Sequence, residues 1–188
     1  MRKIPTLFAR DQATGKVDTT QVTPGCEWVI AGEGVATRKF DGTCTMLDGD
    51  GQWWARREVK PGKTPPAGWR EADHDQLTGR RVGWEPIAQS QFVKFWSEAV
   101  GPADMQPPWD PATYELCGPK INGNPEGYPS HRLIRHGGHN FSVLRALGDD
   151  VFDTPGNAIR AASRHGWEGI VWHHPDGRAA KLKVRDLP

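Results

Sequence analysis

Short runs of alternating apolar and polar residues occupy the first third of the chain. They cover residues 27–30 (EWVI), 34–40 (GVATRKF), 43–47 (TCTML) and 52–59 (QWWARREV), with glycine- and aspartate-containing turns between them. Runs of this kind between turn signals predict β-strands. Residues 60–82 are rich in proline, glycine and charge and lack apolar periodicity, which predicts a surface loop.

Helical periodicity occurs at three later places. Residues 89–100 (QSQFVKFWSEAV) gather apolar side chains on one helical face, and a glycine-proline pair ends the pattern. Residues 141–147 (FSVLRAL) predict a short helix. The helix predicted over residues 155–165 takes a cap and a first-turn proline from Asp153-Thr154-Pro155 and is stopped by Gly166.

The chain closes with further strand patterns. Residues 113–118 (TYELCG) predict one strand, and residues 168–188 hold two strand-like runs joined by a Pro-Asp-Gly turn, hence an antiparallel hairpin. A chain of 188 residues is long enough for one sizeable hydrophobic core. We therefore predict a single domain, residues 1–188, of the α+β class, with mostly antiparallel sheets flanked by helices.

Composition excludes several functional classes. The 24 basic and 23 acidic side chains give a net charge of +1, which argues against coating nucleic acid through bulk charge and leaves room for a local basic groove. The cysteines, Cys26, Cys44 and Cys117, are odd in number and lack CxxC spacing, so neither a disulfide framework nor a zinc knuckle is expected. No segment has the pattern of a signal peptide or a membrane span. We expect a cytoplasmic monomer that does not bind membranes.

Lys39 is the first candidate for chemistry. It begins the pattern Lys-x-Asp-Gly, which chance produces in about one chain in twenty of this length. The closing hairpin offers support: if its turn holds two or four residues, Glu168 and Ile170 share a face with two lysines. These lysines are Lys181 and Lys183. Ordinary cross-strand ion pairs on a solvated face would produce the same pattern.

Two further segments are rich in polar residues. In residues 114–128 (YELCGPKINGNPEGY), Glu115 lies in a predicted strand, and the glycines and asparagines after it demand an irregular loop. This loop lacks the common phosphate-binding glycine motifs and is by itself a turn. The run HRLIRHGGHN contains His131, His136 and His139 without a carboxylate or cysteine at familiar metal spacing. We expect it to form a basic edge for a phosphate end.

The order of the motifs adds information. Lys-x-Asp-Gly, a strand glutamate after an aromatic residue, Glu-Gly-Ile-Val and Lys-x-Lys resemble the motif series of the polynucleotide ligase and capping-enzyme superfamily. More narrowly, KFDGT, WARREVKPG, YELCGPKINGNPEGYP and EGIVWHHPDGRAAKLKVRD are similar to the small ATP-dependent 5′-to-3′ RNA ligases, over residues 35–188. The resemblance implies an ATP-grasp-like nucleotidyltransferase domain. Only five residues follow Lys183, so we expect no OB domain. Cys44 stands where many ligases have arginine, which favours the RNA ligases over DNA ligases.

The resemblance implies that Lys39 attacks the α-phosphate of ATP to form a lysyl-AMP. A free lysine has a pKa of about 10.4 and is protonated at neutral pH. Burial, nearby cations or a metal must therefore lower its pKa before the amine can attack. By the same resemblance, Lys181 and Lys183 contact the α-phosphate. Glu168 and, more weakly, Asp41 hold Mg²⁺ or Mn²⁺, directly or through water.

The resemblance also assigns the nucleoside contacts. Glu115 matches the glutamate that binds the ribose or helps to hold a metal. Arg57, with Arg56 beside it, matches an arginine that contacts the ribose or the acceptor phosphate, and alternation allows only one of them on the active face. Tyr128 and Ile170 are the candidates for sandwiching adenine.

We therefore predict an ATP-dependent RNA ligase whose partner is RNA with 5′-phosphate and 3′-hydroxyl ends. It would act through lysyl-AMP and RNA-adenylate intermediates. The alternatives are a DNA-nick ligase, a nucleotidyltransferase that stops at AMP transfer, and a catalytically idle RNA-binding module. Retention of Lys39, Glu168 and both late lysines argues against the idle module, because a pure binder needs no nucleophile.

Overall fold

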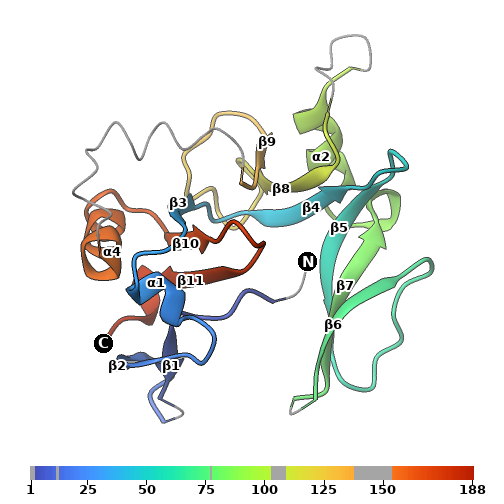
Figure 1. Cartoon of the computed structure of the whole chain (residues 1–188). Helices are drawn as coiled ribbons and strands as arrows, with labels where there is room; N and C mark the ends of the chain where they lie inside the picture. Colours follow the sequence, from blue (N-terminus) through green and yellow to red (C-terminus); the bar gives the residue numbers. More distant parts are fainter. Residues whose placement is uncertain (1–2, 12, 77, 103–108, 138–153) are drawn as a thin grey trace. The chain divides into compact units, whose positions relative to one another are not determined.

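The computed structural model describes residues 3–11, 13–76, 78–102, 109–137 and 154–188. These residues form two compact units, which are described separately (Figure 1). The first unit is built from Asp41–His136 together with Lys3, and the second from Ile4–Phe40 and the described residues that follow His136. The single domain stays a prediction. The helix predicted over 141–147 and the side chain of His139 lie outside the described residues.

The first unit is organised around an antiparallel sheet with the strand order β6-β7-β5-β4-β8-β9 (Figure 1). Its strands are β4 (Thr43–Leu47), β5 (Trp53–Val59), β6 (Arg70–Asp75), β7 (Arg80–Pro86), β8 (Ala112–Cys117) and β9 (Arg132–Arg135), and its helical segments are η1 (Ile87–Gln89) and α2 (Val93–Val100). The strands predicted over 43–47, 52–59 and 113–118 are thereby confirmed.

One face of this sheet packs against α2. The core on that face is formed by Leu47, Trp53, Ala55, Ile87 and Tyr114, with Trp96 and Val100 of α2 packed against it. The expected helix over 89–100 begins four residues late, because a 3-10 turn precedes it. Its end after Val100 is confirmed by a glycine with a φ of 77°.

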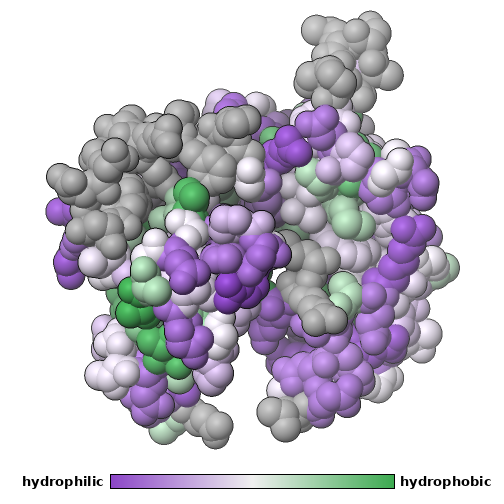
Figure 2. All heavy atoms as spheres, viewed as in Figure 1, coloured by the Kyte–Doolittle hydropathy of each residue, from purple (hydrophilic) through white to green (hydrophobic). Residues whose placement is uncertain are grey.

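The prediction of a loop over 60–82 is wrong in part, because β6 and the start of β7 lie there. β6 is the edge strand and none of its residues is buried. An edge strand with solvent on both sides needs no apolar alternation, so the pattern that marks a strand is missing. Arg81 of β7 and Glu71 of β6 form an ion pair. The surface over these two strands is hydrophilic (lower right in Figure 2).

The second unit combines two small sheets with two helices (Figure 1). A hairpin of β1 (Phe8–Arg10) and β2 (Val17–Val22) forms one sheet, and β3 (Val35–Lys39), β10 (Gly169–His173) and β11 (Ala179–Lys183) form the other in the order β11-β10-β3. The helices are α1 (Glu27–Ile30) and α4 (Pro155–Arg164), and the 3-10 turn η4 (Val184–Asp186) follows β11. The predicted strand over 34–40 is confirmed as β3.

The helix predicted over residues 155–165 is confirmed as α4, with its cap and its first-turn proline. The Thr154 side chain accepts a hydrogen bond of 3.2 Å from the Asn157 amide, and a proline occupies the first turn. Its buried face packs into a core that also contains Trp28, Ile170 and Leu182. None of the described helices is long and apolar enough to cross a membrane.

The strand predicted over 27–30 is wrong, because EWVI forms the single helical turn α1. Trp28 and Val29 are both buried, which two successive residues of a strand with one buried face would not be. Ile30 is 50% exposed and Val35 is 55% exposed. Figure 2 shows apolar surface on the part of the second unit where Figure 1 draws α1.

The closing hairpin is confirmed, but its predicted register is wrong. Ile170 pairs with Leu182 and Val171 pairs with Lys181. The turn between the strands holds the five residues 174–178, closed by a 2.9 Å bond from the His174 amide to the Arg178 carbonyl. An odd number of turn residues reverses the face relation expected for two or four. Ile170 therefore faces the core, on the side of the sheet opposite Lys181.

Candidate active site

The candidate site of the second unit begins with a row of three residues across β3, β10 and β11. Gly169 in the central strand is directly opposite Lys39 on one side and Lys183 on the other. Directly paired residues share a face, so both lysines stand on the same face of the sheet. A side chain at Gly169 would collide with the carbonyl oxygen of Leu182, so glycine is required between the two lysines.

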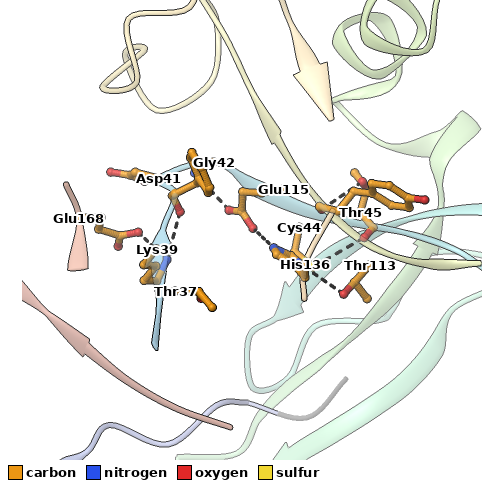
Figure 3. A network of polar contacts seen from close by, with 12 residues as sticks. Thr37, Lys39, Asp41, Gly42, Cys44, Thr45, Thr113, Glu115, His136 and Glu168 are labelled. Carbon is orange, nitrogen blue, oxygen red and sulfur yellow. Dashed lines mark hydrogen bonds and ion pairs between the residues drawn. The ribbon is translucent and has the colours of Figure 1, made fainter. Parts of the chain in front are cut away.

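Glu168 joins the two lysines of this row. It lies in a bend just before β10, and its carboxylate pairs with the Lys39 Nζ and, at 2.5 Å, with the Lys183 Nζ. Figure 3 shows the Glu168 carboxylate directed at Lys39. The predicted proximity of Glu168 and Lys183 is therefore present, although the bend produces it rather than strand alternation.

The electrostatics of Glu168 follow from this geometry. Its side chain is only 7% exposed. Burial raises the pKa of Glu168, but the charge of Lys39 and hydrogen bonds from Lys183 and Lys39 outweigh burial, so the net pKa is lowered. The carboxylate is therefore held in its charged form.

Lys181 extends the same face by one row. It pairs with Val171, which is two residues from Gly169 and so points to the same side of β10. Its backbone is fixed by hydrogen bonds from its amide to the Pro5 carbonyl (3.0 Å) and from the Leu7 amide to its carbonyl (2.7 Å). We call Lys39, Glu168, Lys181 and Lys183 the lysine site. Three ammonium groups and one carboxylate give it an excess of positive charge, which suits an anion such as a phosphate.

In the first unit, the Asp-Gly part of the Lys-x-Asp-Gly pattern is held by polar side chains. The Asp41 amide donates to Glu126 Oε1 at 2.9 Å, and the Gly42 amide donates to Glu115 Oε1 at 3.1 Å. The Asn122 side-chain amide donates to both Asp41 Oδ1 and the Gly42 carbonyl, each at 2.9 Å. The asparagine-containing loop predicted from residues 114–128 thus fixes the Asp-Gly backbone of the motif.

Gly42 is required here by packing. A Cβ at this position would lie 2.8 Å from the Cys117 Sγ and 2.8 Å from the Glu115 Cγ. Such distances are shorter than van der Waals contact, so any side chain would displace β8. The glycine of the motif therefore lets Glu115 approach the backbone closely.

Glu115 also belongs to a second polar group on the same sheet. Its Oε2 lies 2.9 Å from His136 Nε2, and His136 Nδ1 lies 2.9 Å from the Thr113 hydroxyl (Figure 3). Cys44 is directly opposite Glu115 in the β4–β8 pairing. Sequence spacing missed this group because its members come from different strands. His136, expected at a basic edge, instead has a carboxylate and a cysteine beside it.

The structure separates Arg56 from Arg57. Arg57 shares its face of β5 with the core residue Ala55 and pairs with Glu85 at 2.6 Å. Arg56 has the opposite orientation, on the face to which Glu115 belongs through the β4 and β8 registers. The predicted ligand Arg57 therefore faces away from Glu115, and Arg56 is the arginine of the pair on the Glu115 face.

The two residues predicted to sandwich adenine lie in different environments. Tyr128 is half-buried. Its carbonyl accepts a hydrogen bond from Asn124 Nδ2 at 3.0 Å, and its amide donates to Asn124 Oδ1 at 3.1 Å. The Arg132 guanidinium lies 4.3 Å from the centroid of its ring. Ile170 is fully buried in the core of the second unit. Its placement gives no support to contact with a base.

His131 also differs from its predicted role at a basic edge. Its ring is almost fully buried, stacks on Phe95 and lies 2.8 Å from the Glu98 carboxylate. The hydrogen bond from His131 lowers the pKa of Glu98. This histidine connects β9 to α2 and is part of the packing of the first unit.

Two curated proteins are similar to the chain. It is 25% identical to RNA ligase 1 of Danio rerio over 266 aligned positions, which cover 99% of this chain and 80% of that protein. It is 26% identical to RNA ligase 1 of Rattus norvegicus over 220 positions, which cover 81% of this chain and 67% of that protein. No protein-family model matches the chain. The similarity is distant and supports an RNA-ligase-like protein.

Proposed function

We propose that this protein is an ATP-dependent RNA ligase that uses Lys39 as its nucleophile. The observation that carries the proposal is the row in which Lys39 and Lys183 flank Gly169 and share the Glu168 carboxylate. It places an amine and further cations on one face of a sheet. The similarity to two proteins named RNA ligase 1 supports the choice of reaction and of RNA as the substrate.

In the first step the Lys39 Nζ attacks the α-phosphorus of ATP. A nitrogen–phosphorus bond forms, the bond from the α-phosphorus to the pyrophosphate oxygen breaks, pyrophosphate leaves, and Nζ gives up its protons to solvent or base. Lys181 and Lys183, on the same face as Lys39, offset the negative charge that develops on the phosphate. Glu168 orients both ammonium groups before the nucleotide arrives.

A magnesium or manganese ion fits the chemistry of Glu168. Its carboxylate oxygens are hard donors of the kind that Mg²⁺ prefers, and the side chain is charged and nearly buried. Glu168 would hold the ion, directly or through water, and the ion would offset charge on the triphosphate. Asp41 accepts a hydrogen bond from Asn122, and its role as a further metal ligand stays a prediction.

The AMP then moves to RNA in two displacements. A 5′-phosphate oxygen attacks the phosphorus of the lysyl-AMP, the nitrogen–phosphorus bond breaks, and Lys39 is released from an RNA-adenylate. The 3′-hydroxyl of the other RNA end attacks the 5′-phosphorus, a phosphodiester forms, and AMP leaves. Arg56, rather than Arg57, is the arginine that we propose for contact with the ribose or the acceptor phosphate, because of its face on β5.

Intact-mass measurement tests the first step. The protein is incubated with ATP or GTP and Mg²⁺, and we expect a mass gain equal to one AMP with ATP alone. Lys39→Ala should remove the adduct, whereas Lys63→Ala, a change at an exposed lysine of the first unit, should retain it. An adduct that survives Lys39→Ala would overturn the mechanism.

A gel assay tests the substrate. The protein is mixed with ATP and 5′-phosphorylated single-stranded RNA, RNA hairpins, nicked RNA or nicked DNA. Joined RNA is the expected product. Sealing of nicked DNA alone would make the protein a DNA ligase, and adduct formation without any joining would limit it to AMP transfer.

A further inference from the structure

We propose that Cys44, Glu115 and His136 form a binding site for one thiophilic divalent transition metal, with Zn²⁺ as the best fit. We call these three residues the cysteine–histidine cluster. Their candidate ligand atoms all lie within 4.8 Å of one another. The cluster uses none of the residues of the lysine site, and it assigns Glu115 to metal binding, which is one of the two roles that the resemblance allows.

The sheet of the first unit places the three side chains on one face. Cys44 of β4 is directly opposite Glu115 of β8, and Glu115 is directly opposite Ile134 of β9. His136 follows Ile134 by two residues, so alternation returns its side chain to the Glu115 face. The three donors therefore come from β4, from β8 and from the residue that follows β9. The strand pairing and the hydrogen bond from the His136 amide to the Thr113 carbonyl fix their spacing before a metal arrives.

Hydrogen bonds orient Glu115 and His136 so that one atom of each is directed at the other. Glu115 uses Oε1 for the Gly42 amide, which leaves Oε2 directed at His136. The His136 amide donates to the Thr113 carbonyl at 3.0 Å, and Nδ1 lies 2.9 Å from the Thr113 hydroxyl. A histidine that bonds a neighbour through one ring nitrogen binds metal through the other, which is the usual arrangement around ligand histidines.

The exchange of a proton for a metal follows from this arrangement. A divalent cation binds the Cys44 sulfur as a thiolate, and the thiol proton goes to solvent. It binds His136 through Nε2 as a neutral imidazole, in which Nδ1 carries the proton and donates to the Thr113 hydroxyl. The 2.9 Å contact between His136 Nε2 and Glu115 Oε2 is then replaced by a bond from each of these atoms to the ion.

The donor set selects the class of metal. Sulfur, imidazole nitrogen and carboxylate oxygen are all good ligands for Zn²⁺, whereas Mg²⁺ and Ca²⁺ take oxygen alone. With ordinary zinc bond lengths, nitrogen, oxygen and sulfur donors around a tetrahedral ion are about 3.3–3.7 Å apart. Small side-chain rotations bring the cluster to these distances. Three protein ligands leave a fourth position for water, and His136, at 29% exposure, is reachable from solvent.

Cobalt substitution is the sharpest test. Protein freed of metal with a chelator is titrated with Co²⁺, and we expect one ion per chain, an absorption band from thiolate-to-cobalt charge transfer, and visible bands of a four-coordinate ion. Zn²⁺ should displace Co²⁺ and abolish these bands. Co²⁺ binding without a thiolate band would overturn the proposal.

Matched variants locate the site. Cys44→Ser should abolish the thiolate band and weaken binding at least about tenfold, and Thr113→Val should weaken binding by about 10–100-fold by releasing His136. Cys26→Ala, a cysteine of the second unit, should leave the band unchanged. If Cys44→Ser does not fold by circular dichroism, His136→Gln replaces it. A band retained in either variant would contradict the assignment.

The metal site and the proposed ligase function can fail separately. Lys39→Ala should bind Co²⁺ as the wild type does, because Lys39 is not a ligand. Loss of the AMP adduct with cobalt binding intact therefore concerns the lysine site alone, whereas normal adduct formation without cobalt binding rejects the metal site alone.

Discussion

The lysine site of the second unit and the cysteine–histidine cluster of the first unit each span three adjacent strands. In the lysine site the central strand contributes Gly169, and Lys39 and Lys183 stand on either side of it. In the cluster the central strand contributes Glu115, between Cys44 and His136. The lysine site carries ammonium donors, which suit an anion, whereas the cluster carries donor atoms with lone pairs, which suit a cation. The central strand thus contributes an uncharged glycine where an anion is expected and a carboxylate where a cation is expected.

We expect the largest effect, on AMP-adduct formation, from a variant of Lys39 that keeps its positive charge but removes the amine. Lys39→Arg retains the ion pair with Glu168 but replaces a potential amine nucleophile by a guanidinium that stays protonated. We expect the AMP adduct to fall below detection by intact mass, with the melting temperature and Co²⁺ binding unchanged. An adduct on the Arg variant would show that another residue is the nucleophile.

The second prediction concerns two glycines: Gly169 in the lysine site and Gly42 beside the cysteine–histidine cluster. Gly169→Ala and Gly42→Ala each place a Cβ against backbone or β8 side-chain atoms, so we expect each to lower the free energy of unfolding by about 1–3 kcal/mol in urea titrations. Gly49→Ala is the control, because its Cβ meets open space. The first variant should lose adduct formation, and the second should lose Co²⁺ binding. Wild-type stability in both would contradict the packing argument.

The smallest effect is the pH dependence of the Glu168 ion pairs. The pKa of Glu168 in the folded protein lies below its ordinary value of 4.5, so its contribution to stability is present above that pH and is lost as pH falls through the folded pKa. The urea midpoints of the wild type and Glu168→Gln, measured from about pH 3 to 6.5, should converge at the acidic end. A constant difference across this range would mean that the carboxylate charge does not contribute.

Much of the strand framework could be predicted from local pattern. β3, β4, β5, β8 and the closing hairpin have alternation and turn residues, and α4 has its cap and first-turn proline, so local physics decides them. β6 could not be predicted because an edge strand without a buried face has no apolar period. EWVI was assigned the wrong period because four residues are too few to distinguish a strand from one helical turn.

The candidate sites were predictable only in part, because pairing register depends on contacts that are distant in sequence. The motif order leads to Lys39, Glu168 and Lys183, which the structure brings together. The partners of His136 come from β4 and β8, and no spacing rule could find them. The orientation of Arg56 follows from strand pairing, which local sequence does not specify.

The five-residue turn after β10 has a consequence for how this chain can change over evolution. Surface turns usually accept insertions and deletions freely. Here the number of turn residues decides which side chains of β11 face the core. With Ile170 and β10 fixed in the core, adding or removing one residue would turn Lys181 and Lys183 inward and Leu182 outward. Adding or removing two residues would leave each side chain on its present face. Relatives that retain both lysines on the face opposite the core should therefore differ in this turn by even numbers of residues.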